Sequence, residues 1–206
     1  MSEESPNGPG ALAPAASAPH EQLAEALIAL RLETERRLAR EFSRSLPFAD
    51  GLFDRWERAR RLGFGEGTSI YDSACVFGEV SVGRNVWIGP WAMLDGSGGL
   101  VIGDYVSISA GVQIYSHDTV LWALSGGALP ARKGAVAIGS NVYLGSQSVI
   151  AQGVRIGARC VVSANSLVLD DVPDATIVGG TPARPIGRVE GEGEAVRMVF
   201  DRQETA

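Results

Sequence analysis

The sequence predicts a mainly β fold, a parallel β-helix of six-residue repeats that follows a short α-helical region. Two observations carry this prediction. An Ile, Leu or Val recurs every six residues, apart from a two-residue slip in "LDGSGGLV" and one long break, and a small residue or Val follows most of these positions four residues later. A sandwich strand has a period of two residues and a helix a period of 3.6, so neither explains the pattern. The fourteen repeat positions are Ile70, Val76, Val82, Ile88, Leu94, Ile102, Ile108, Ile114, Ile138, Leu144, Ile150, Ile156, Val162 and Val168.

The repeat has a simple physical reading. Each short strand points one large aliphatic side chain inward, and the chain then turns a corner where only a small residue fits. Stacked coils bury a continuous aliphatic column, and each coil covers the edge of the previous one. The composition agrees, because 45% of the residues are hydrophobic, only 7% are aromatic, and 26 are glycine.

The N-terminal third differs in composition from the repeat region. Residues 1–19 are rich in Pro, Ala, Ser and Gly and are predicted to be disordered. The apolar spacing predicts one helix from His20 to about Ser45, and a second over "DGLFDRWERARRLG" with Asp50 as its N-cap and Gly63 as its stop. The expected organisation is a tail at 1–19, a helical region at 20–63, the β-helix at 64–188 with an inserted loop at 117–136, and a C-terminal tail at 189–206.

Charge and cysteine content exclude several classes of protein. A net charge of −6 and a pI near 5.0 argue against a nucleic-acid binder that relies on phosphate contacts. Cys75 and Cys160 form no metal-binding or disulfide pattern, which favours a reducing compartment. The chain shows no signal-peptide pattern and no apolar window long enough for a transmembrane helix, so a cytoplasmic location is expected.

The break in the repeat is the most informative stretch, "SISAGVQIYSHDTVLWALSGGALPARKGAVAIGS". The repeat resumes in full at Ile138 after stopping at Ile114, which indicates a loop inserted into a continuous coil. Asp118 falls where a small inward residue belongs, and an unpaired carboxylate in an aliphatic column is costly, so the coil must leave its path there. His117 lies at an outward position just at this departure, and three repeats back from it lies Asp95, so the two residues are expected on one face.

The "IG" openings of many repeats and the ending "GGTPARPIG" resemble the hexapeptide-repeat acetyltransferases. This resemblance implies a left-handed β-helix, acetyl-CoA as co-substrate, no metal, and a homotrimer. The string "MLDGSGGLVIGDYVSISAGVQIYSHD" is similar to the galactoside and maltose acetyltransferase branch. Gly89 stands where those enzymes carry an acceptor-contacting Asn, and Tyr143 where they commonly have Trp. The helical start and "WALSGG" look closer to acetyltransferases of surface-polysaccharide clusters.

The resemblance also implies roles for individual residues. His117 is the expected general base. Asp95 either contacts the acceptor or orients His117, with a purely structural turn residue as the alternative. Asp118 is a further catalytic candidate, and Trp122 either walls the cleft or anchors the loop. The expected acetyl-CoA contacts are Tyr143, Gly145, Ser146, Ser163, Ala164, Asn165 and Arg184, with the oxyanion donor near Gly145 and Ser146.

The resemblance therefore implies transfer of an acetyl group from acetyl-CoA to a sugar hydroxyl, in surface-polysaccharide, lipopolysaccharide or nucleotide-sugar metabolism. N-acetylation of an amino sugar and acetylation of a drug or other small molecule remain alternatives, as does a non-catalytic β-helix scaffold. A carbonic anhydrase of the same fold would need three histidines around a metal. His117 is the only histidine in the repeat region, which argues against that class.

Overall fold

A computed structural model describes residues 19–201 of the chain, which divide into two compact units between Gly51 and Leu52. In the first unit, helix α1 (Pro19–Phe42) is followed by α2 (Phe48–Leu52), which runs across the boundary between the units. Thr34 and Leu38 of α1 are buried, and a Cβ on Gly51 would come within 2.7 Å of a Leu38 methyl group. A glycine therefore lets α2 pack closely against α1. The disordered tail predicted at 1–19 lies outside the described residues except for Pro19.

The single helix predicted over residues 50–63 is wrong in one respect, because α2 ends at Leu52 and a separate helix α3 (Arg55–Arg61) follows. Its N-cap is Asp54 rather than Asp50, and the Asp54 carboxylate accepts hydrogen bonds from the backbone N–H groups of Trp56 and Glu57, both at 2.8 Å. Helix α3 covers the first coil of the β-helix, where Ala59 is 1% exposed. The helix thus closes one end of the aliphatic column.

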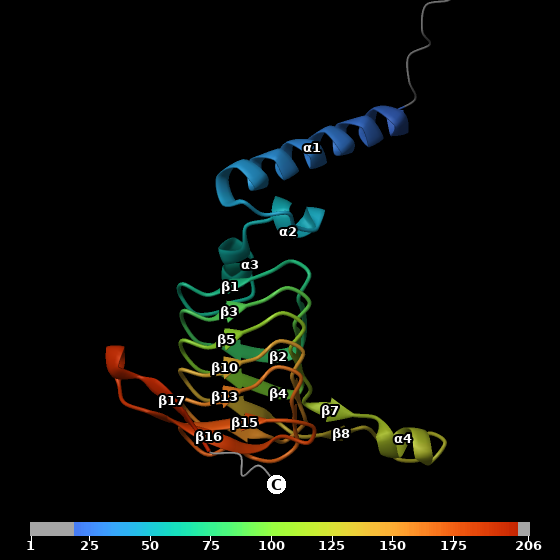
Figure 1. The fold of residues 1–206 in the computed structure, drawn as a ribbon. Coiled ribbons are helices and arrows are strands. Elements are labelled where there is room, and N and C mark those ends of the chain that lie inside the picture. Colours follow the sequence, from blue (N-terminus) through green and yellow to red (C-terminus); the bar gives the residue numbers. More distant parts are fainter. Residues whose placement is uncertain (1–18, 202–206) are drawn as a thin grey trace, which may run out of the picture. The chain divides into compact units, whose positions relative to one another are not determined.

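The second unit is a parallel β-helix of stacked coils (Figure 1), and the strand pairings give each coil three faces joined by corners. Its first face holds β1 (Ser69–Ile70), β3 (Trp87–Ile88), β5 (Ser107–Ile108), β10 (Tyr143–Leu144), β13 (Val161–Val162) and β15 (Thr176–Gly179). The second face holds the first parts of β2 (Cys75–Val82) and β4 (Met93–Ile102), then β6 (Gln113–Ile114), β11 (Val149–Ile150) and β14 (Leu167–Val168). The third face holds the last parts of β2 and β4, then β9 (Val136–Ile138) and β12 (Arg155–Ile156).

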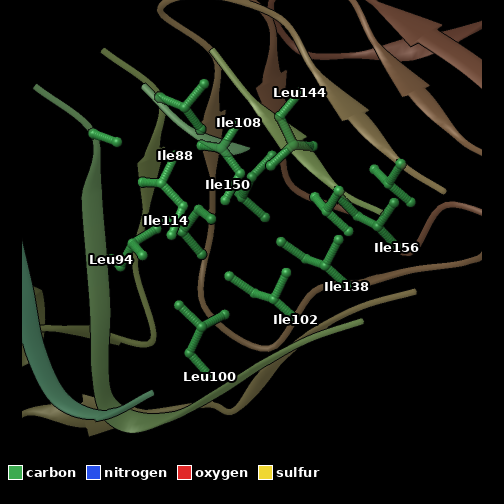
Figure 2. Close-up of a cluster of buried hydrophobic side chains, with 14 of the residues drawn as sticks. Ile88, Leu94, Leu100, Ile102, Ile108, Ile114, Ile138, Leu144, Ile150 and Ile156 are labelled. Atoms are coloured by element: carbon green, nitrogen blue, oxygen red, sulfur yellow. The ribbon is translucent and has the colours of Figure 1, made fainter. Parts of the chain in front are cut away.

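The core confirms the six-residue repeat. Of the fourteen predicted positions, thirteen are buried, and Val76 is partly buried against the same core. Figure 2 labels nine of these side chains and Leu100, which are directed toward one another inside the coils. The strand register stacks them in columns, for example Leu94 on Ile114 and Ile114 on Ile150. Each aliphatic side chain therefore packs against the equivalent residue of the neighbouring coils.

The two-residue slip in "LDGSGGLV" is absorbed by an irregularity between β2 and β4. Gly78 pairs with Gly96, but Val80 pairs with Leu100, so the extra residues bulge out at one corner. A Cβ on Gly96 would lie 2.2 Å from the Glu79 carbonyl oxygen. Glycine is required there because the bulge lies directly against the backbone of the preceding coil.

The long break in the repeat, residues 117–136, forms an arm that projects from the stacked coils of the β-helix, which we call the prism (Figure 1). Strands β7 (His117–Asp118) and β8 (Arg132–Lys133) pair antiparallel at its base, and a short helix α4 (Val120–Leu124) lies beyond them. The coil resumes at β9, in register with the last part of β4. The loop expected at 117–136 is therefore an insertion with secondary structure of its own.

The segment expected as a C-terminal tail from residue 189 contains ordered strands. Strand β16 (Arg184–Glu190) pairs antiparallel with β15, and after the short 3₁₀ helix η1 (Gly193–Ala195) strand β17 (Arg197–Phe200) pairs with β16. Glu190 accepts hydrogen bonds from Arg188 and Arg197 at 2.7 and 2.6 Å. The six-residue period ends before this hairpin, which is why the repeat did not predict it.

Candidate active site

His117 and Asp95 lie together at the corner that follows β6. We name it the His117 corner, and it comprises residues 95–99, 115–118 and 151–154 of successive coils. The His117 Nδ1 atom lies 2.5 Å from Oδ2 of Asp95, and the two residues belong to neighbouring coils. The His117 side chain is 36% exposed, whereas that of Asp95 is 3% exposed. A buried carboxylate thus holds the Nδ1 edge of an accessible imidazole ring.

The bulge at the slip places the Asp95 carboxylate. Its Oδ1 accepts a hydrogen bond from the Ser97 N–H at 2.9 Å, and its Oδ2 accepts one from the Ser116 N–H at 3.0 Å. Ser116 is fully buried, and its hydroxyl accepts a hydrogen bond from the Gly98 N–H at 2.8 Å. The extra residues therefore supply donors that a regular repeat would lack.

These contacts determine the charge of Asp95. Burial alone would raise its pKa, but hydrogen bonds from Ser97, His117 and Ser116 outweigh burial and lower the pKa from 3.8 to about 2. Asp95 is therefore ionised at neutral pH and accepts hydrogen bonds with both oxygens. When the imidazole is neutral, its Nδ1 must carry the proton that faces this carboxylate, which leaves the lone pair on Nε2. A histidine in this state can take a proton from another molecule.

The Asp118 side chain has different hydrogen-bond partners from those of His117. Its carboxylate accepts hydrogen bonds from Arg132 Nη2 at 2.6 Å and from the Val120 N–H at 2.9 Å, and it also accepts one from Gln152. The hydrogen bond from Arg132 is the main cause of a lowered Asp118 pKa. All of these partners belong to the arm or to the next coil, so the structure places Asp118 at the root of the arm.

The expected acetyl-CoA residues gather elsewhere. Gly145 and Ser146 follow β10, and Ser163, Ala164 and Asn165 follow β13 at the equivalent position of the next coil. We name this the Ser163 corner, and it comprises residues 145–148 and 163–166. It is separated from the His117 corner by the face that holds β6, β11 and β14. Within one chain, the two groups of predicted site residues therefore lie at different corners.

The Ser163 corner offers backbone groups rather than side chains. The Gly145 N–H donates to the Val162 carbonyl at 2.8 Å, so it is already used by the ladder and is a poorer oxyanion donor than predicted. The N–H groups of Ser146 and Ala164 form no hydrogen bond among residues 19–201. They occupy equivalent positions of successive coils and form a short column of free donors. Such a column can bind carbonyl or phosphate oxygens by donating hydrogen bonds to them.

Tyr143 lies on the first face, where it lines a groove of about 600 Å³. The other walls come from the same face and from the C-terminal hairpin, and they are mainly apolar. The ring of Tyr143 is within reach of a bound molecule, since the residue is 45% exposed. Further lining residues are Tyr105, Val161, Val189, Val196 and Met198.

Two other predicted residues lie outside the residues that define the two corners. Arg184 lies near the C-terminal end of the prism, where its guanidinium contacts Asp170 at 3.5 Å and donates to the Ala183 carbonyl at 2.8 Å. Trp122 lies on α4 in the arm and is 53% exposed. It is close to Gly127 at the end of the arm, as expected of a loop anchor, and it presents half of its surface to solvent.

Sequence reasoning missed Ser97, Ser116 and Gln152, which complete the His117 corner through hydrogen bonds. Counting coils finds two of them, because Ile114 pairs with Ile150 and the residues two places further on are Ser116 and Gln152. Among the described residues, no three His, Cys, Asp or Glu side chains are grouped as a metal site. In the same part of the chain, no helix is long and apolar enough to cross a membrane.

Comparisons with known proteins agree with the coil architecture. Residues 135–170 match the family model described as bacterial transferase hexapeptide (six repeats). A chloramphenicol acetyltransferase of Morganella morganii is 36% identical over 108 residues, covering 42% of this chain and 50% of that protein. Protein CapG of Staphylococcus aureus is 41% identical over 97 residues, covering 43% of this chain and 52% of that protein. The chain spans about a third to a half of the length of the first curated relatives it matches.

One solved structure is similar over nearly its whole length. The hexapeptide-repeat-containing acetyltransferase VCA0836 of Vibrio cholerae, in complex with acetyl coenzyme A, is 32% identical with a TM-score of 0.51. The match covers 81% of this chain and 90% of that protein. The expected membership of the galactoside and maltose branch stays a prediction. The repeat, the coils and this relative together place the chain in the family of hexapeptide-repeat acetyltransferases.

Proposed function

We propose that the chain transfers an acetyl group from acetyl-CoA to the hydroxyl of a sugar, with His117 as the general base. The observation that carries this proposal is the His117 imidazole, held at Nδ1 by a buried and ionised Asp95 while the residue remains partly exposed. The Nε2 lone pair takes the proton of the acceptor hydroxyl as its oxygen attacks the thioester carbonyl. The C–O bond forms, the tetrahedral intermediate collapses with cleavage of the C–S bond, and the proton passes from His117 to the departing thiolate.

Asp95 serves in this proposal as the group that orients His117. Of its two expected roles, acceptor contact is disfavoured, because the residue is 2% exposed and both carboxylate oxygens already accept hydrogen bonds. The carboxylate fixes the tautomer and stabilises the imidazolium that forms when the proton is taken. Asp95 is then a positioning residue rather than a residue that touches substrate.

The Ser163 corner and the groove beside Tyr143 are the proposed place of acetyl-CoA. The free N–H groups of Ser146 and Ala164 suit the carbonyl oxygens of the pantetheine arm or a developing oxyanion. The apolar groove suits the uncharged part of the cofactor, and Arg184 supplies a cation for phosphate once its weak contact with Asp170 is exchanged. The complex of VCA0836 with acetyl coenzyme A supports this donor.

A second copy of the chain would bring the two corners together, and we propose a homotrimer. Helix α4 of the arm presents apolar residues that are all exposed in the single chain, with Leu124 at 79%. The apolar groove lies at a different place on the same chain, so a contact between the arm and a neighbouring copy is head-to-tail, and a three-fold rotation between copies closes it as a ring. Light scattering is expected to give the mass of a trimer, and a monodisperse monomer would contradict it.

The acetyl-transfer proposal is tested with acetyl-CoA and a panel of acceptors, by following the release of free thiol. We expect turnover with at least one sugar or nucleotide-sugar that carries a free hydroxyl. Turnover only with amino sugars would show that the acceptor group is an amine rather than a hydroxyl. Turnover with chloramphenicol would indicate the drug-modifying alternative. Acetyl-CoA should also raise the melting temperature, because it binds only the folded state. If acetyl-CoA gives no stabilisation and no acceptor gives turnover, the result would favour a non-catalytic scaffold.

A further inference from the structure

Strand β7 is attached to the coil before it and to the coil after it through two consecutive side chains. Neighbouring side chains of a strand point in opposite directions. His117 contacts Asp95, which belongs to the preceding coil, and Asp118 contacts Gln152, which belongs to the following coil. The proposed base is therefore held from one side directly and from the other side through its neighbour in the chain.

The Asp118 carboxylate holds together the start of α4, strand β8 and the next coil. It accepts the Val120 N–H at the start of α4, the guanidinium of Arg132 on β8, and the side-chain amide of Gln152 on the next coil. Its own side chain is only 24% exposed, whereas that of Arg132 is 53% exposed. These contacts lie at the base of the arm, where the chain leaves the prism and returns to it.

Gln152 depends on this contact for its orientation. Its Nε2 group donates to Asp118, while its Oε1 is buried and accepts no hydrogen bond from residues 19–201. The Asp118 carboxylate thus provides the one side-chain hydrogen bond that orients the Gln152 amide within that part of the chain. Loss of the carboxylate leaves the Gln152 amide without its one side-chain hydrogen bond, and this favours movement of β7 away from the coil.

We propose that Asp118 is a positioning residue for the acetyl transfer, which locks β7 to the following coil through Gln152 and so sets the direction of the His117 imidazole. This inference rests on the proposed function of His117. It assigns Asp118 a role distinct from acid–base catalysis, because its oxygens are directed to Arg132, Val120 and Gln152. General-base catalysis is sensitive to small displacements of the base, so the lock acts on the rate of the chemical step.

The test compares Asp118→Asn, Gln152→Leu and the double variant with the wild type. Asp104→Asn is a matched control, because Asp104 also accepts a backbone N–H, that of Arg84 at 2.9 Å, and pairs with the Arg84 guanidinium at 3.0 Å, on the prism away from the arm. Steady-state kinetics give kcat and KM for acetyl-CoA. Trypsin cleavage after Arg132 and Lys133 in the full-length protein measures release of the arm without any dependence on activity.

We expect Asp118→Asn to lower kcat by roughly 10-fold or more with little change in the acetyl-CoA KM, and to accelerate cleavage after Arg132 and Lys133. Gln152→Leu should act in the same direction, and the double variant should lose little more than Asp118→Asn alone, because both remove one lock. Asp104→Asn should change neither measurement.

Unchanged kcat in both single variants, or fully additive losses in the double variant, would overturn the lock. If the wild type acetylates no acceptor, the proposed function fails, and the assignment of Asp118 to that reaction fails with it. If trypsin cleaves Asp118→Asn and Gln152→Leu at the wild-type rate, the lock alone is overturned. Should Asp118→Asn fail to fold, the single variant Gln152→Leu decides the question with the same two measurements.

Discussion

The His117 corner and the Ser163 corner arise from the same six-residue repeat but differ in what they present. At the His117 corner, side chains dominate, since the Asp95 carboxylate holds His117 and the Ser116 N–H, and Asp118 separately pairs with Arg132 at the base of the arm. At the Ser163 corner, the repeat continues without interruption, and small residues leave the backbone exposed. The comparison teaches that a regular β-helix corner offers backbone donors, whereas reactive side chains require an interruption of the repeat.

The largest effect on activity in this comparison is expected from removing the charge of Asp95 at the His117 corner. We expect Asp95→Asn to lower kcat by about 10²-fold, because the amide no longer fixes the Nδ1 proton or stabilises the imidazolium. The acetyl-CoA KM should change little, since the Ser163 corner is intact. Steady-state kinetics with a saturating acceptor measure both, and a large rise in KM with unchanged kcat would place Asp95 in binding instead.

The same carboxylate makes a pH-dependent contribution to stability. Its pKa is lowered from 3.8 to about 2 in the folded chain, which corresponds to about 2 kcal/mol. A lowered pKa stabilises the folded state above the unfolded value and is lost as the pH falls, so the contribution should disappear between about pH 4 and pH 2. Urea unfolding of wild type and Asp95→Asn should therefore differ at pH 6 and converge toward pH 2. A constant difference over this range would contradict the assignment.

At the Ser163 corner, the equivalent experiment changes how closely the backbones of two successive coils approach each other at Gly145 and Ala164. A Cβ on Gly145 would lie 2.4 Å from the Ala164 nitrogen, so Gly145→Ala must displace one of the free N–H donors. We expect a loss of about 1–3 kcal/mol in the free energy of unfolding from overpacking, together with a higher KM for acetyl-CoA. Thermal unfolding and titration with acetyl-CoA measure the two effects.

The matched control changes a side chain at the same corner. Ser163→Ala keeps the backbone in place, and the Ser163 N–H still donates to the Val178 carbonyl at 2.9 Å. We expect a change of no more than about 0.5 kcal/mol in stability and a nearly unchanged KM. A large rise in KM for this variant would show that the corner recognises its ligand through side chains and would remove the contrast with the His117 corner.

The fold was predictable because the repeat is a direct record of burial. All fourteen repeat positions, from Ile70 to Val168, carry Ile, Leu or Val, and the phase of the repeat located the arm. The helix boundary at Asp54 was missed because Asp50 and Asp54 offer the same capping chemistry four residues apart. The C-terminal hairpin was missed because its strands are antiparallel and lie outside the period.

The site was predictable in part. The break in the repeat identified His117, and counting three repeats back identified Asp95, because the register of stacked coils is fixed by the aliphatic columns. The roles of Ser97, Ser116 and Gln152 depend on hydrogen bonds across coils that no local pattern records. The location of the proposed acetyl-CoA residues at a different corner also required the fold, since backbone donors leave little trace in the sequence.

The central claim is that the interruption of the repeat carries the chemistry, through His117 as general base. The most direct measurement is the kcat of His117→Ala with acetyl-CoA and the best acceptor of the panel. We predict a loss of at least ~10²-fold, with the melting temperature, the oligomeric mass and the binding of acetyl-CoA unchanged. Full activity in a folded His117→Ala variant would contradict the account.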